Sequence, residues 1–128
     1  MAIKYKVSKN VNTLKSSNED NYYAKAISNG EVSSDELIDI LSEKTKIHKA
    51  DCVRFMMYLE ETMVEQLENG KIVRLGDIGY FQVGISSNGV DAETKVTAKT
   101  INAAKINFRV GKSFRNMLKG LIYEKVKE

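Results

Sequence analysis

The chain contains no proline and no tryptophan, and it has one cysteine and one histidine among its 128 residues. A single cysteine cannot form an intramolecular disulfide, and such cysteine usage is typical of proteins in reducing compartments. No apolar run is long enough to cross a bilayer, and the N-terminal MAIKYKVSKN lacks the apolar segment of a secretion signal. The absences predict a soluble, unexported protein of the cytoplasm with no membrane partner.

Residues for catalysis or metal binding are also scarce. His48 has no Cys or His at the spacing of zinc ligands, and the adjacent Glu60 and Glu61 point in different directions on a helix. Ser86-Ser87 has no base partner, and the glycines form no phosphate-binding loop. We therefore expect no enzymatic activity, no cofactor, no metal and no small-molecule substrate.

The net charge is only +3, but the charges are unevenly distributed along the chain. Residues 1–30 carry five lysines and two acidic residues, whereas residues 31–69 carry ten acidic and four basic residues. Residues 91–128 carry nine basic and four acidic residues. An acidic middle between basic ends indicates a surface for nucleic acid or another polyanion, with ordinary solvated helix faces as the alternative.

Hydrophobic periodicity predicts strands in the first part of the chain, followed by two helices. Alternation predicts strands at residues 2–8 and 21–28. Ser33 and Glu36 fit a capping box that begins a helix lasting until about Lys46. A second helix, ending at Asn69-Gly70, has an apolar stripe wider than one neighbour needs, which predicts a dimer. The stripe includes Cys52, Met56, Leu59, Met63 and Leu67.

The second half of the chain predicts a hairpin, a polar arm and a short helix. Strands are expected at residues 71–75, 80–85 and 105–110. Residues 86–104 are polar and predict a mobile, loosely extended arm. Ser113 is expected to cap a final helix whose inward-facing residues are Phe114, Met117, Leu118, Leu121 and Ile122.

Three segments in this order resemble the HU and IHF family of bacterial DNA-binding proteins: SSDELIDILSEKT, KADCVRFMMYLEETMVEQLENGKIVRLGDIGYFQV and INFRVGKSFRNML. They contain the L-x-x-x-G-x-F and F-x-x-G-K patterns of that family. The resemblance covers residues 33–125. The preceding addition, from MAIKYKVSKN to Tyr22-Tyr23-Ala24, is similar to the extended HU-like subfamily of Bacteroides-type bacteria.

The resemblance implies an α+β fold with a helical hairpin, an antiparallel sheet with a protruding arm, and a short C-terminal helix. Residues 1–32 would form an added strand pair and residues 33–128 the DNA-binding domain. Two chains would interlock as a homodimer in the nucleoid, and their arms would enter the minor groove of DNA. The usual wedge proline is missing, and Gly84 and Ser86 stand where the family often has arginine. We therefore expect weaker bending of the DNA.

The expected function is architectural, largely sequence-independent binding of double-stranded DNA. Lys112 matches the lysine of the G-K pattern, which the resemblance places on phosphate, whereas the other candidates are chosen by charge and position. The alternative is a structural or protein-interaction module with weak or no DNA binding. The candidate DNA-binding residues are Lys95, Lys99, Lys105, Arg109, Lys112 and Arg115.

Overall fold

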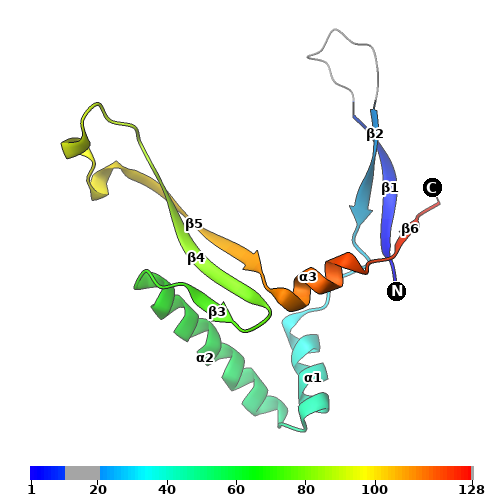
Figure 1. Cartoon of the computed structure of the whole chain (residues 1–128). Helices are drawn as coiled ribbons and strands as arrows, with labels where there is room; N and C mark the ends of the chain where they lie inside the picture. The colour runs from blue at the N-terminus through cyan, green and yellow to red at the C-terminus, as the bar shows by residue number, and fades with distance from the viewer. Residues whose placement is uncertain (11–20, 128) are drawn as a thin grey trace.

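The computed structural model describes residues 1–10 and 21–127, which form an α+β fold with two separate sheets (Figure 1). One sheet has the strand order β2-β1-β6 and the other has the order β3-β4-β5. Within the described residues the elements are β1 (Ile3–Asn10), β2 (Asn21–Ile27), α1 (Ser34–Thr45), α2 (Lys49–Glu68), β3 (Val73–Leu75), β4 (Gly79–Ser87), the 3-10 turns η1 (Glu93–Lys95) and η2 (Ala98–Thr100), β5 (Ile101–Val110), α3 (Lys112–Lys119) and β6 (Tyr123–Lys125). No helix in these ranges is long and apolar enough to span a bilayer.

The two predicted helices are present, and polar side chains fix where they begin. Ser33 Oγ accepts the Glu36 N–H at 3.2 Å, which confirms the predicted cap, although the returning bond of a full capping box is not among the described contacts. His48 caps α2, because its Nδ1 accepts the Ala50 N–H at 3.3 Å. Lys49 Nζ and Asp39 Oδ1, 2.8 Å apart, link the two helices, and this contact raises the pKa of Lys49.

The end of α2 makes β3 shorter than the prediction of a strand from Lys71. The Gly70 N–H donates to Leu67 O at 3.0 Å, and the Lys71 N–H donates to Gln66 O at 3.1 Å. With Gly70 at φ +78°, these two bonds form a Schellman motif. The Lys71 N–H is therefore used by the helix end, and the strand begins only at Val73.

The β4–β5 hairpin is longer than predicted, so residues 86–104 are not a loosely extended arm throughout. Pairing continues to Ser86↔Ala103 and, after a register shift, Ser87↔Ile101. An exposed two-stranded ribbon needs no apolar face, so Ser, Ala and Asn can occupy it. Such a ribbon lacks the alternation of apolar and polar residues from which strands are predicted. The distal segment, residues 88–100, contains η1 and η2 and lies at the far end of the projecting hairpin (Figure 1).

The C-terminal region also differs from the prediction. Gly111, not Ser113, is the N-cap of α3, and the Ser113 N–H instead donates to Asp77 O at 3.2 Å. The helix ends at Lys119, so Leu121 and Ile122 lie beyond it. Residues 123–125 then form β6, which runs parallel to β1 with the register Ile3↔Tyr123. The N-terminal strand pair is thus two strands of a three-stranded sheet.

The isolated chain has very little buried core. Ile38, at 6% exposure, is the only buried large apolar side chain in the described ranges. On α2, Phe55 is 70% exposed and Met57 is 64% exposed. The predicted inward-facing residues of α3 are exposed as well, with Met117 at 54% and Leu118 at 50%. Exposed apolar patches of this kind often mark interaction surfaces.

Candidate nucleic-acid interface

Strict alternation along β4 and β5 separates an apolar face of the sheet from a polar one. Phe81 lies opposite Phe108, with the two ring centroids 4.8 Å apart, on the face that meets α2. On the other face, Tyr80 lies opposite Arg109. This second face, which we call the basic sheet face, comprises Arg74, Tyr80, Gln82, Lys105, Asn107 and Arg109. It contains no acidic side chain.

Two of the predicted residues, Lys105 and Arg109, belong to the basic sheet face. They lie on β5 with Asn107 between them on the same side, and together with Gln82 they line a shallow hollow of about 480 Å³. Lysine and arginine donate charge-assisted hydrogen bonds to phosphate, and the amides of Gln82 and Asn107 add neutral donors. The sheet thus places several hydrogen-bond donors side by side on an exposed surface.

Arg74 is a member of this face that the sequence prediction missed. It lies opposite Tyr80 in the β3–β4 register, and its guanidinium carbon is 5.0 Å from the centroid of the Tyr80 ring. Stacking on an aromatic ring holds the side chain extended while its N–H groups stay available. The alternation Val73-Arg74-Leu75 was the signal that could have identified it, since it places the Arg74 side chain on the other face of the strand from two apolar side chains.

Two more of the predicted residues, Lys112 and Arg115, lie on α3 directly after β5. Residues three and four apart share a helix face, so Lys112, Arg115 and Lys119 form one basic stripe, which includes Lys119 as a second missed residue. The stripe is fixed relative to the sheet, because the Gly111 N–H donates to Ile78 O at 2.7 Å.

Two glycines permit this close junction between the sheet and α3. A Cβ on Gly111 would collide with the backbone carbonyl of Asp77. Gly79 has φ +148°, and a Cβ there would lie 2.9 Å from the Phe108 ring. Both positions therefore require glycine, and they determine how the stripe on α3 meets the basic sheet face.

Lys95 and Lys99 lie apart from the other four predicted residues. They belong to η1 and η2 at the far end of the hairpin. Lys95 Nζ is 2.6 Å from Asp91 Oδ1, so this lysine is already paired with a carboxylate. Val96, between the two turns, is 58% exposed. The structure thus joins Lys105, Arg109, Lys112 and Arg115 in one region and leaves two lysines at the tip.

Comparisons with known proteins give a family match and similar solved structures. Residues 1–125 match the model of a family described as an HU domain fused to wHTH, Ig, or Glycine-rich motif. Among solved structures, a protein from Bacteroides vulgatus with DNA binding as its suggested role superposes with a TM-score of 0.72 at 16% identity, covering 99% of this chain. This chain spans only 49% of that protein's length.

A point mutant of HU from Thermotoga maritima gives a TM-score of 0.49 at 21% identity, covering 67% of this chain and 97% of HU. None of the curated proteins compared with the chain matches it. The match to the family model extends over nearly all of the sequence, including the strands β1 and β2 before the first helix and β6 after the last. The chain belongs to the HU-HIG family of HU-like domains.

Proposed function

We propose that the chain binds double-stranded DNA as an architectural, largely sequence-independent protein of the nucleoid. One observation carries this proposal: the basic sheet face, which contains no acidic side chain, leads directly through Gly111 into α3 and its basic stripe. Membership of an HU-like family supports it. The proposed DNA-contacting residues are Lys95, Lys99, Lys105, Arg109, Lys112 and Arg115, extended by Arg74 and Lys119.

The proposed active form is a homodimer. Met56, Leu59, Met63 and Leu67 of α2 line an open groove of about 670 Å³ together with Phe81 of the sheet. Fully burying one such side chain contributes about 1.5–3 kcal/mol. In an isolated chain these side chains stay partly exposed, so most of this stabilising free energy is not gained. A second copy would cover the groove with the same kind of apolar surface and supply the missing core.

The proposed binding mode uses phosphates for affinity. The basic residues are exposed and spread over two elements, which suits contacts along a DNA backbone. With no proline in the chain, the tip offers only aliphatic residues such as Val96 as a wedge. We therefore propose less bending of DNA than proteins with a proline wedge produce.

The proposed division into a strand-rich extension, residues 1–32, and a DNA-binding domain, residues 33–128, needs one refinement. Strand β6 comes from the C-terminal part but completes the sheet of the extension. The extension would then be held to the DNA-binding domain in two places: by the chain that leads into α1 and by the pairing of β1 with β6. Assignment to a Bacteroides-type subfamily is part of the same proposal.

A second candidate function is that of a protein-interaction module with little affinity for DNA. It is favoured by the acidic residues 31–69 and by the pairing of Lys95 with Asp91, which lowers the free positive charge at the tip. This alternative predicts that removing charge from the basic sheet face leaves DNA binding unchanged.

The test compares two double variants in a mobility-shift assay with duplex DNA at two salt concentrations. Lys105→Gln with Arg109→Gln removes two charges from the basic sheet face, and Lys44→Gln with Lys71→Gln removes two from elsewhere. We expect the first pair to weaken binding by at least about tenfold at low salt and the second to have little effect. No measurable binding by the wild type at about 50 mM salt would favour the interaction module.

A further inference from the structure

The two faces of the β2-β1-β6 sheet differ in chemistry. The register places Lys6 opposite Lys25 and Ser8 opposite Tyr23 on one face, with Lys4 next along β1. We call this side of the sheet the lysine face; it carries Lys4, Lys6, Lys25 and Tyr23 together with Ser8, Ile27 and Glu124. The other face is mainly apolar, although it also carries Lys9 and Lys125; its remaining residues are Ile3, Tyr5, Val7, Tyr22, Ala24, Ala26 and Tyr123.

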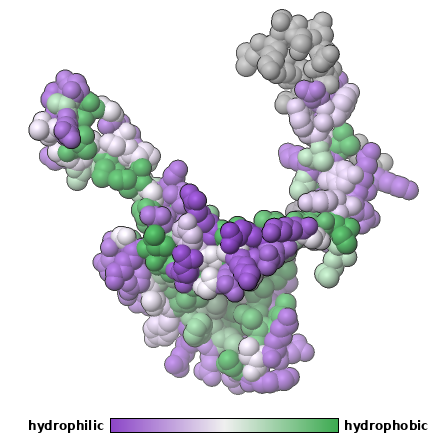
Figure 2. All heavy atoms as spheres, in the orientation of Figure 1, coloured by the Kyte–Doolittle hydropathy of each residue, from purple (hydrophilic) through white to green (hydrophobic). Residues whose placement is uncertain are grey.

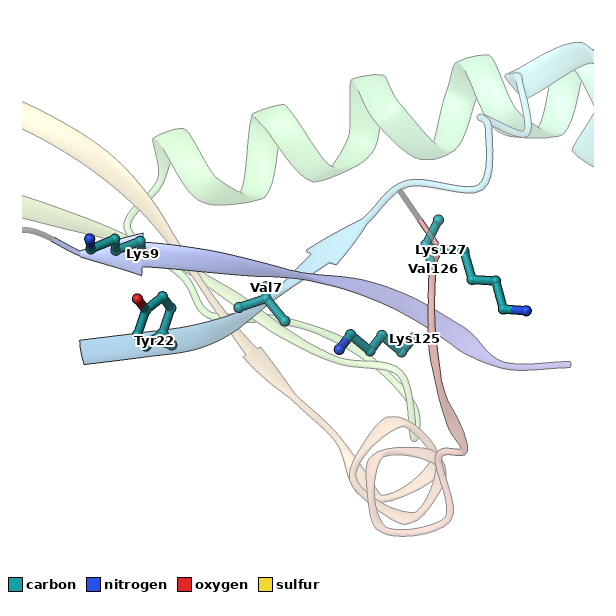
Figure 3. A pocket seen from close by; sticks show the side chains of 6 residues that line it. All are labelled: Val7, Lys9, Tyr22, Lys125, Val126 and Lys127. Carbon is teal, nitrogen blue, oxygen red and sulfur yellow. The ribbon is translucent and has the colours of Figure 1, made fainter. Parts of the chain in front are cut away.

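Figure 3 shows part of the apolar face, where a hollow of about 710 Å³ is lined by residues from all three strands and the residues that follow them. Val7 and Lys9 come from β1, Tyr22 from β2 and Lys125 from β6. Lys9 Nζ is 5.9 Å from the centroid of the Tyr22 ring. Lys125, at the end of β6, and Lys127, just beyond it, both line this hollow, so their charges do not belong to the lysine face.

The lysine face brings two like charges, Lys6 and Lys25, directly opposite each other. Side chains directly opposite in an antiparallel pair have Cβ atoms about 5 Å apart, and like charges at that separation disfavour the sheet. None of the ion pairs among the described residues includes Lys4, Lys6 or Lys25. Glu124 is the one acidic residue in the described strands of this sheet, and it lies beside Lys4 at the other edge from Lys25. An external polyanion would relieve this repulsion.

A short linker joins this sheet to α3 of the proposed DNA-binding surface. Three residues, Gly120 to Ile122, separate α3 from β6. The Ile3 N–H donates to Ile122 O at 2.7 Å, and the Val126 N–H donates to Tyr5 O at 2.9 Å. The sheet and the β4–β5 hairpin project to the same side, away from α1 and α2 (Figure 1). Hydrophilic side chains gather along α3 between the two projections (Figure 2).

We propose that the lysine face is a second phosphate-binding surface, which extends the footprint on DNA beyond the basic sheet face and α3. Lys4 and Lys6 are two residues apart on one strand, so their Cα atoms lie roughly 6.7 Å apart along it. Duplex DNA has a negative charge about every 1.7 Å of its axis, which gives each lysine a phosphate within reach. The Tyr23 hydroxyl adds a neutral donor. This inference rests on the DNA binding proposed above.

The test uses two double variants that remove equal charge from one sheet. Lys6→Gln with Lys25→Gln changes the lysine face, and Lys125→Gln with Lys127→Gln changes the hollow on the opposite face. Binding is measured over a salt series on a duplex of about one helical turn, roughly 10 bp, and on one of about four turns. We expect the first variant to lower the magnitude of the log-log salt slope on the long duplex by about 0.9 for each phosphate contact that it loses, and a dimer loses up to four such contacts.

On the short duplex the first variant should bind like the wild type, and the second variant should do so on both duplexes. Equal effects of the two variants on the long duplex would overturn the inference, because total charge rather than the lysine face would then explain the change. Unchanged binding with increased aggregation would also overturn it, since the lysines would then serve to protect a sheet edge. If the wild type binds neither duplex, the proposed function is wrong, and so is this inference, which rests on it.

Discussion

Replacing Met63 with lysine tests whether the apolar groove on α2 is an interface between two copies. Met63 is half-buried in the single chain and lines the groove with Leu59, Leu67 and Phe81. In a monomer, a lysine here could extend its ammonium group into the open groove and remain hydrated, so the free energy of unfolding would change little. In a dimer that covers the groove, the same ammonium group would be buried without a partner.

The dimer should therefore be weakened by at least about 3 kcal/mol, which corresponds to more than about a hundredfold in its dissociation constant. Thr62→Lys is the matched control, because Thr62 precedes Met63 on α2, is exposed, and gains the same charge. Sedimentation at micromolar concentration should show a dimer for the wild type and for Thr62→Lys, and monomer or unfolded protein for Met63→Lys. A stable wild-type monomer, or equal behaviour of the two variants, would refute the reasoning.

Further predictions concern the candidate nucleic-acid interface. Lys112→Ala should lower the magnitude of the log-log salt slope by about 2 for a dimer while weakening unrelated duplexes equally, and an unchanged slope in a binding titration would remove Lys112 from the site. Gly111→Ala should lower the melting temperature, because the new Cβ would collide with the carbonyl of Asp77; calorimetry showing unchanged stability would contradict this contact. Arg74→Ala should weaken binding at low salt more than Arg74→Lys does, since lysine keeps the charge; equal losses in anisotropy titrations would mean that stacking on Tyr80 matters more than charge. Trypsin should cleave free protein after Lys99, and DNA should suppress this cleavage; resistance of the free protein would count against an accessible tip.

The helices could be predicted from the sequence because their signals are local. Ser33 stands before a periodic apolar run, and Asn69-Gly70 closes the second helix where the stripe ends. The hairpin was also recognisable, since large apolar residues occupy every second position from Phe81 to Ile85 and from Ile106 to Val110.

The errors arose where distant segments determine the structure. Nothing near Tyr123 indicates a strand, because β6 exists only by pairing with β1 at the other end of the chain. Ser113 is a good capping residue, but Asp77 takes its N–H and places the start of α3 at Gly111. The sequence prediction grouped Lys95 and Lys99 with the other candidates by charge and position in the chain, whereas the length of the hairpin separates them in space.

The most direct test of the central claim is the salt dependence of wild-type binding to two duplexes of unrelated sequence. If about six phosphate contacts per dimer provide the affinity, both duplexes should give a log-log slope of about −5 and nearly equal dissociation constants at each salt concentration. A slope near zero, or a strong preference for one duplex, would contradict binding through the phosphate backbone.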